Sequence, residues 1–418
     1  MSEDIRWWCG FDWASEKHHV CLLDASGNCL GERDVEHTGA ALAELCQWLL
    51  DKTGGTPAEI AVAIEMTSGP AVETLLDRGF AVFGINPKQL DRFRDRFSAA
   101  GAKDDSRDAL VLGDSLRTDR RAFRRLSAED PVIIELREWS RMTDDLEAEL
   151  NRLGNRMRDQ LWRYYPQALK VAGADLTAPW FLALWLQAPT PAKAAKLRKS
   201  AVEQVLASHR IRRLKAAEVL DLLRQKPLTV APGVVEAASG HIRMLVARIR
   251  LVNDQLKAAH RHLDELCAKL EAPMENSPGQ GCEHRDAAIL RSCPGVGRIV
   301  LATVLAEAPE PLRRRDYHAL RALSGQAPVT RRSGKSCIVL RRYACNKRLE
   351  NALYHWARVA VQHDPVSRER YAALRQRGHS HGRALRTVGD RWLFIACTLL
   401  ERGVLFDPGH RNPQAAVA

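Results

Sequence analysis

The sequence predicts an α/β domain, built on a mixed sheet with flanking helices, followed by central coiled-coil helices and a helical C-terminal domain. Strand and helix patterns alternate in the first part of the chain, and apolar residues then repeat by heptads. The last part is helical and very basic, and it follows a linker rich in Pro, Gly and polar residues at 271–284. We therefore expect three domains, at residues 1–128, 129–275 and 285–418.

The first domain alternates between short strands and helices. Its first strand is expected to end at Asp12, and two further strands flank the turn at residues 25–28. Thr38 can cap a helix that runs to Leu50. A hairpin followed by strands that are separated by helices predicts a mixed sheet covered by helices. The other expected elements are buried strands at 59–66 and 80–86 and a short helix at 70–78.

Two heptad repeats mark the central segment. One covers residues 131–164, and the second, cleaner repeat covers residues 242–270. The two helices could pair with each other or with a second subunit, or they could form a plain helical spacer. The second repeat places Ile242, Ile249, Leu256, Leu263 and Leu270 in one core position and Leu245, Val252, Ala259 and Leu266 in the other.

The charge balance favours a polyanionic partner. The 418 residues carry 63 Lys and Arg against 51 Asp and Glu, which gives a formal net charge of +12. Such a balance is typical of nucleic-acid-binding proteins, although basic soluble enzymes also show it. The ten cysteines include no C-x-x-C pair of the kind that zinc sites favour, and we find no signal-peptide pattern or apolar run long enough for a membrane span. We expect a cytoplasmic protein with reduced thiols and no membrane contact.

Four carboxylates are expected to meet at one edge of the predicted sheet. Asp12 and Glu65 end two strands, and Asp105 and Asp108 share one face of a helix that begins in "GAKDDSRDALVL". Carboxylates this close repel one another unless a cation neutralises them. Two Mg²⁺ ions bound to such oxygens can clamp the attacking and leaving oxygens of a phosphodiester. The pattern predicts metal-dependent phosphoryl transfer, unless these residues only cap helices and strand ends.

A second candidate site lies in the basic C-terminal domain. The run "PGVGR" between two apolar helical segments predicts a helix-hairpin-helix that holds a phosphate, although an ordinary turn between helices is the alternative. Ser333 follows in a basic loop, where a hydroxyl is either a hydrogen-bond donor to phosphate or a nucleophile; Ser336 is its neighbouring competitor. The residues expected to contact nucleic acid are Gly295, Gly297, Arg298, Arg331, Arg332, Lys335, Arg341, Arg342, Lys347 and Arg348.

The segments "GFDWASEKHHVCLLDASG", "AIEMTSG", "VFGINPKQ" and "AKDDSRDALVL" occur in the order and context seen in the DEDD insertion-sequence transposases, and the chain resembles that family. The resemblance implies an RNase H/RuvC-like fold in which Asp12, Glu65, Asp105 and Asp108 bind two Mg²⁺ ions, which Mn²⁺ can replace. Asp104 stands where the family usually has a small hydroxyl residue, and we place it outside the set of ligands.

The C-terminal segment is similar to the transposase domain of the same family, whose serine lies in a P-x(4)-S-G context. Pro328, Ser333 and Gly334 match this spacing. The resemblance implies that Ser333 attacks DNA and forms a covalent phosphoserine intermediate, in a composite site with the carboxylates. The stretch "LRRYACNKRL" departs from the glycine- and serine-rich version in the family, and the central region at about 166–228 is longer than in compact members.

The resemblance spans about residues 5–165 and 285–408 and implies a DNA transposase/recombinase of a bacterial insertion sequence. The implied partners are DNA, a noncoding guide RNA and further copies of the chain in a dimer or tetramer, in the cytoplasm and associated with the nucleoid. Two other functions fit the residues. One is a RuvC-like junction resolvase or nuclease that hydrolyses DNA with two metals, and the other is a non-catalytic nucleic-acid-binding protein.

Overall fold

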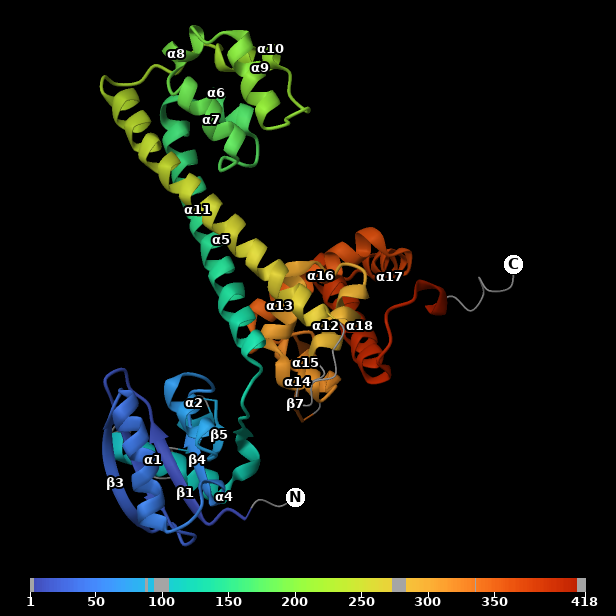
Figure 1. Cartoon of the computed structure of the whole chain (residues 1–418). Coiled ribbons are helices and arrows are strands. Elements are labelled where there is room, and N and C mark those ends of the chain that lie inside the picture. Colours follow the sequence, from blue (N-terminus) through green and yellow to red (C-terminus); the bar gives the residue numbers. More distant parts are fainter. Residues whose placement is uncertain (1–3, 87–88, 94–104, 273–282, 335, 412–418) are drawn as a thin grey trace. The chain divides into compact units, whose positions relative to one another are not determined.

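A computed structural model describes residues 4–86, 89–93, 105–272, 283–334 and 336–411 (Figure 1). The chain divides into two compact units, Met1–Asp130 and Pro131–Ala418. Each unit has its own hydrophobic core, and each is described separately below. Among the described residues, none of the helices has both the length and the apolar character needed to cross a membrane.

The first unit contains a six-stranded mixed sheet in the order β3-β2-β1-β4-β5-β6. Strand β1 pairs antiparallel with β2 and parallel with β4; β2–β3 and β5–β6 are antiparallel, and β4–β5 is parallel. This topology is consistent with an RNase H-like fold and confirms the predicted mixed sheet. The strands are β1 (Trp7–Asp12), β2 (Lys17–Leu23), β3 (Cys29–Glu36), β4 (Ile60–Ile64), β5 (Ala81–Gly84) and β6 (Arg124–Arg125).

Helices cover both faces of this sheet. Helices α1 (Gly39–Thr53) and α2 (Pro70–Asp77) pack on one face, and α4 (Asp105–Thr118) packs on the other. Every residue of β4 is buried, because both faces of a strand in the middle of such a sheet are covered. As predicted, Thr38 caps α1 by accepting a hydrogen bond from the Ala41 backbone N–H at 3.2 Å.

Two long helices, α5 (Pro131–Tyr164) and α11 (Val234–Glu271), form the centre of the second unit. They pair with each other along their length within one chain. The start of α5 shares a core with the end of α11, and the end of α5 shares a core with the start of α11, so the two helices run antiparallel. The heptad positions of α11 face this pairing, since Ile242, Ile249, Leu263 and Leu270 are all fully buried.

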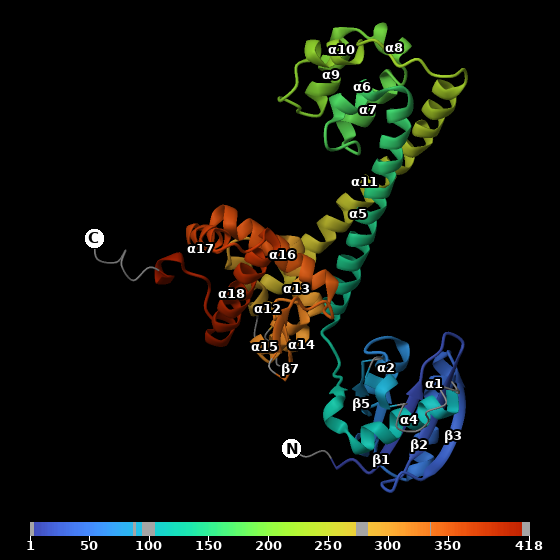
Figure 2. The same ribbon diagram turned by 180° about the vertical axis from the view of Figure 1, so that it is seen from behind.

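The remaining helices of the second unit form two groups at opposite ends of the α5–α11 pair (Figures 1 and 2). One group contains α6 (Pro166–Ala172), α7 (Pro179–Gln187), α8 (Pro191–Ala195), α9 (Lys199–Ser208) and α10 (Ala216–Leu223). The other contains α12 (Glu283–Ser292), α13 (Arg298–Glu307), α14 (Pro309–Arg313), α15 (Tyr317–Leu323), α16 (Lys347–His363), α17 (Pro365–Gln376) and α18 (His381–Arg402).

The C-terminal group also contains a two-stranded hairpin, where the sequence predicted a basic loop. Strand β7 (Val329–Ser333) pairs antiparallel with β8 (Ser336–Leu340). The β-branched residues Val329, Thr330, Ile338 and Val339 favour extended backbone on both sides of the Ser333–Gly334 turn. The domain is therefore helical with one added hairpin.

Candidate active site

Asp12 and Glu65 lie side by side at the carboxyl ends of two parallel strands. Phe11 of β1 pairs with Ile64 of β4; Asp12 is the last residue of β1, and Glu65 directly follows β4. Neighbouring strands lie about 4.8 Å apart, so the two backbones keep this spacing where the carboxylates project. Both residues are half-buried. The structure therefore places two of the four predicted carboxylates at one sheet edge.

The first turn of helix α4 carries the other two carboxylates towards the same edge, although, among the described residues, no three of the four carboxylates offer ligand atoms within 4.8 Å of one another. It packs directly on β1, because a Cβ atom on Gly10 would lie only 1.7 Å from the Ala109 carbonyl oxygen. Gly113, one turn further along α4, lies against the backbone of Cys9 and Gly10. The helix thus runs opposite to β1, and its first turn lies where β1 ends. That turn carries Asp108, which is 3% exposed, and Asp105, which is exposed.

The turn after Asp12 is held by a buried histidine that the sequence reading did not single out. The Ala14 backbone N–H donates to His18 Nδ1 at 3.3 Å, and His18 Nε2 lies 3.0 Å from His37 Nδ1. Burial, together with the nearby His37, lowers the pKa of His18. The neutral ring keeps Nδ1 available as an acceptor, which fixes the path of the chain directly after the Asp12 carboxylate.

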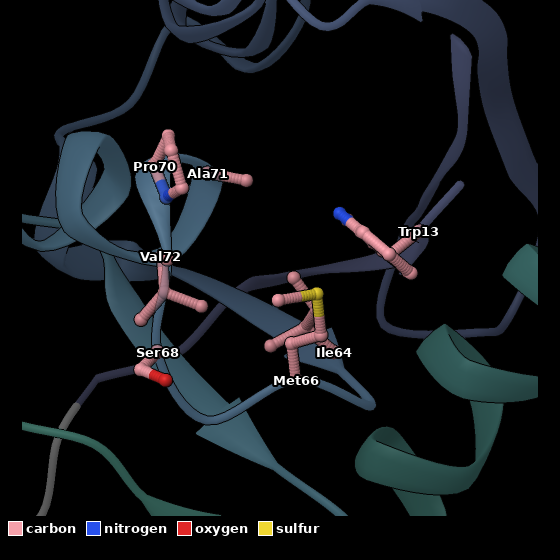
Figure 3. Close-up of a pocket in the computed structure, with 8 residues that line it drawn as sticks. Trp13, Ile64, Met66, Ser68, Pro70, Ala71 and Val72 are labelled. Atoms are coloured by element: carbon pink, nitrogen blue, oxygen red, sulfur yellow. The ribbon is translucent and has the colours of Figure 1, made fainter. Parts of the chain in front are cut away.

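A small hollow opens where β4 ends and α2 begins. It is lined by residues that follow Asp12 and flank Glu65, and by the start of α2. Figure 3 shows Trp13 on one side of the hollow, Pro70 and Val72 on the other, and Met66 and Ile64 between them. Trp13 is 42% exposed. The hollow thus has an apolar, partly aromatic wall, and none of the four carboxylates lines it.

Ser333 lies at the tip of the exposed hairpin of the second unit. It is the last residue of β7 and pairs with Ser336, and the following Gly334 has φ +55°, in the left-handed region that favours glycine. Arg331, Arg332 and Ser333 are all exposed. On the facing strand Ile338 and Val339 are also exposed, at 53% and 63%. The predicted Lys335 lies outside the described residues.

Two transposase family models match the chain. A model of the DEDD type, described as "Transposase", matches residues 9–166, and a model described as "Transposase IS116/IS110/IS902 family" matches residues 287–372. The mini-circle protein of IS117 from Streptomyces coelicolor is 34% identical over 406 residues, which cover 94% of each chain. The y4uE protein of Sinorhizobium fredii is 56% identical over 217 residues, and the match spans 52% of this chain and 60% of that protein.

The chain belongs to the IS110 family of insertion-sequence transposases. The first matched segment contains all four carboxylates, and the second contains Ser333 and every residue predicted to contact nucleic acid. In this IS110-family chain the carboxylates belong to the first unit and Ser333 to the second. The combination of the two sites in one reaction therefore stays a prediction.

Many of the predicted nucleic-acid-binding cations of this transposase-family chain form ion pairs within the protein. Glu350 lies 2.5 Å from Arg341 Nη2 and 3.0 Å from Lys347 Nζ, and Asp144 lies 2.8 Å from Arg348 Nη1. Burial opposes ionisation of Glu350, but its hydrogen bonds with Arg341 and Lys347 lower its pKa overall. The Arg348–Asp144 pair joins α16 to α5, so part of the positive charge has a structural role.

Other predicted cations are differently placed. Arg298 pairs with Asp264, and Arg342 donates Nε to the Ala327 carbonyl oxygen at 3.2 Å. Within the part of the chain that the structure describes, Arg331 and Arg332 have no acidic partner. The two guanidinium groups next to Ser333 are thus free to meet a phosphate.

The predicted helix-hairpin-helix turn joins α12 to α13, and its two glycines differ in role. Gly295 has φ +89°, and a Cβ there would lie 2.8 Å from the Trp356 carbonyl oxygen of α16. Trp356 also donates its indole N–H to the Pro294 carbonyl oxygen at 2.9 Å. Gly297 is the N-cap of α13 and has open space around it. Gly295 therefore packs the turn against α16, whereas Gly297 leaves the start of α13 approachable.

Proposed function

We propose that this protein cuts and rejoins DNA as the transposase/recombinase of its insertion sequence, by metal-dependent phosphoryl transfer with Ser333 as the nucleophile. One observation carries the proposal. Close backbone contact at Gly10 packs α4 on β1, and this contact supports a site at the carboxyl end of β1 that would join Asp105 and Asp108 of the first turn of α4 to Asp12 and Glu65. Catalytic carboxylates supplied by separate elements are expected where metal ions are held.

The four carboxylates form a donor set that fits Mg²⁺ or Mn²⁺. All are hard oxygen ligands, and a bound cation would offset the cost of burying an ionised Asp108 side chain. Asp12, Glu65, Asp105 and Asp108 would hold the metal. When bound, it would supply positive charge to the oxygens of the reacting phosphodiester.

Ser333 is well placed to reach a DNA phosphate, since it lies at an exposed hairpin tip beside two unpaired guanidinium groups. Its Oγ would attack phosphorus, and the bond between phosphorus and the departing sugar oxygen would break. Ser333 loses its hydroxyl proton, and the departing oxygen takes up a proton. Arg331 and Arg332 would stabilise the charge that develops on the phosphoryl oxygens. A DNA hydroxyl would later reverse the step and release Ser333.

A noncoding guide RNA and self-assembly complete the proposal. The family resemblance suggests that base pairing of the RNA reads the DNA sequence while the protein contacts shape and backbone, as in other RNA-guided systems. It also suggests that carboxylates and serine from different copies of the chain share one site. Sequencing the RNA that co-purifies with the protein tests the first point, and absence of enriched RNA from the element would contradict it.

Strand exchange on a DNA substrate with Mg²⁺ tests the catalytic assignment. We expect Asp12→Asn and Ser333→Ala each to abolish it, because one removes a metal ligand and the other removes the nucleophile. Ser336→Ala is the matched control, since it removes a neighbouring hydroxyl from the same hairpin, and it should retain activity. If Ser333→Ala still cleaves DNA, the RuvC-like hydrolytic reading is correct. If Asp12→Asn exchanges strands normally, the carboxylates are only structural.

A further inference from the structure

The helices α8, α9 and α10 at one end of the α5–α11 pair carry a dense positive surface to which neither family match extends. Residues 191–226 contain ten Lys and Arg against three Asp and Glu. These helices share a buried core with α6, α7 and the adjoining turns of α5 and α11, so they form an ordered body (Figures 1 and 2). The matched family segments are residues 9–166 and 287–372.

Some cations of this surface lie close together, and some of them have no acidic partner among the described residues. Arg224 donates Nη2 to the Leu197 carbonyl oxygen at 2.7 Å, which brings it beside Lys196 and Arg198. Lys196, Arg198 and Arg224 are all exposed. In the described part of the chain, no ion pair involves Lys196, Arg198 or Arg212, whereas Lys199 and Lys215 each pair with a glutamate of their own helix.

Several of these cations occupy positions where local physics disfavours them. Arg198 and Lys215 are the N-caps of α9 and α10, and neither side chain caps the helix. Positive charge at the positive end of the helix dipole is unfavourable, and a Ser, Thr, Asp or Asn would satisfy the free N–H groups. Arg210, just after α9, has φ +56°, a conformation that normally favours glycine. At these positions a cation stands where helix capping or backbone conformation favours another residue. Such departures from local preferences indicate that the positive charge has a function.

The surface suits a duplex better than a single strand. Residues 191–226, which form α8–α10, contain no Phe, Trp or Tyr, whereas Trp162 near the end of α5 is 70% exposed. Single-stranded nucleic acids are bound by stacking bases on exposed aromatic rings, and this surface offers none among its described residues. Exposed Arg and Lys side chains beside free helix N–H groups contact phosphates without reading bases.

We propose that α8–α10 form a second, sequence-independent binding surface for the phosphate backbone of duplex DNA. The surface would hold DNA at the end of the α5–α11 pair opposite to the C-terminal group of helices, without taking part in the chemistry. The choice of DNA as the bound duplex rests on the proposed function. The positive charge and the lack of exposed rings rest on this structure alone.

The test measures binding of the full-length protein to a duplex DNA of about 30 base pairs at several salt concentrations. Each phosphate contact adds about 0.9 to the slope of log affinity against log salt. The variant Lys196→Gln/Arg198→Gln/Arg212→Gln should therefore lose about 2.7 from the slope. Between 50 and 200 mM salt, its affinity should fall about 40-fold less than that of the wild type.

Two further variants distinguish the effect of lost charge on DNA binding from an effect of lost folding. Arg198→Lys/Arg212→Lys keeps the charge and should keep the slope. Arg210→Gly removes a cation from a backbone position that suits glycine, so it should lower the slope by about 0.9 while the unfolding temperature stays level or rises. An unchanged slope in the triple variant overturns the proposal. A slope that changes only for duplex RNA overturns the assignment to DNA. A wild-type protein that binds no DNA at all contradicts the proposed function itself.

Discussion

At the scale of single residues, Gly10 sets the geometry on which the carboxylate site depends. A methyl group at this position would overlap the Ala109 carbonyl oxygen, at 1.7 Å, and approach the Gly113 backbone nitrogen, at 2.7 Å. Both contacts are to backbone atoms, so no side chain can rotate away. The close approach of α4 to β1 therefore requires glycine at residue 10.

We predict that Gly10→Ala destabilises the full-length protein by about 3 kcal/mol or more, because β1 and α4 must move apart. Urea unfolding measures the change. Gly39→Ala is the matched control: Gly39 begins α1 with open space around it, and its substitution should change stability by less than about 1 kcal/mol. Equal stability of the two variants would show that α4 does not depend on this contact.

Residue-level reasoning from the sequence could place Asp12 and Glu65 at strand ends and Asp105 and Asp108 in the first turn of a helix, because strand ends and helix starts are readable from apolar patterns. It did not find His18 or Trp13, although both lie within seven residues of Asp12. Their roles depend on burial and on partners such as His37, which the sequence alone does not reveal. The signal available for Trp13 was only that a large aromatic residue directly follows a candidate ligand.

At the scale of elements, Glu307 joins three helices of the second unit. It lies in α13, and its carboxylate lies 3.1 Å from Arg141 Nε of α5 and 3.1 Å from Arg348 Nε of α16. The Asn346 side chain also donates to it at 2.8 Å. Burial of Glu307 opposes ionisation, but these donors lower its pKa below the usual 4.5. Since the folded pKa is the lower one, ionised Glu307 stabilises the fold above about pH 4.5, and this contribution is lost as the pH falls further.

We predict that Glu307→Gln destabilises the protein by about 3 kcal/mol at pH 7, because the variant leaves Arg141 and Arg348 without their shared acid in a site where the carboxylate is only 5% exposed. Urea unfolding at pH 7 and pH 4 measures the effect. The wild type should lose more stability than the variant between these two values. A variant with the same pH dependence as the wild type would rule out Glu307 as the titrating group.

Most elements of the first unit and the α5–α11 pair were predictable, because long periodic patterns dominate there. The β7–β8 hairpin was not predicted, because short strands are stabilised mainly by pairing with each other. Basic residues also interrupt the β-branched residues of these strands, so the sequence shows no clear apolar strand pattern. The ion pairs were also beyond prediction. Asp144 and Arg348 lie far apart in the sequence, and only the packing of α5 against α16 shows that part of the basic charge is neutralised.

At the scale of the whole molecule, the two predicted halves of the catalytic machinery belong to different compact units. The carboxylates lie in residues 1–130 and Ser333 lies in residues 131–418. The link between them is implied by the family resemblance and stays a prediction. The extra helices α6–α10 had no functional reading from sequence. The proposed DNA-binding surface depends on the positions of cations at helix starts and in a left-handed backbone conformation, which the sequence alone does not show.

The central claim is that the carboxylates and Ser333 act in one reaction that links the protein to DNA. Mass spectrometry of the covalent protein–DNA adduct, formed with Mg²⁺ and digested to peptides, tests it most directly. We predict that the DNA-linked peptide contains Ser333 with the phosphate on its hydroxyl, and that Asp12→Asn and removal of Mg²⁺ both abolish the adduct. An adduct on Ser336, or normal strand exchange without any adduct, would contradict the account.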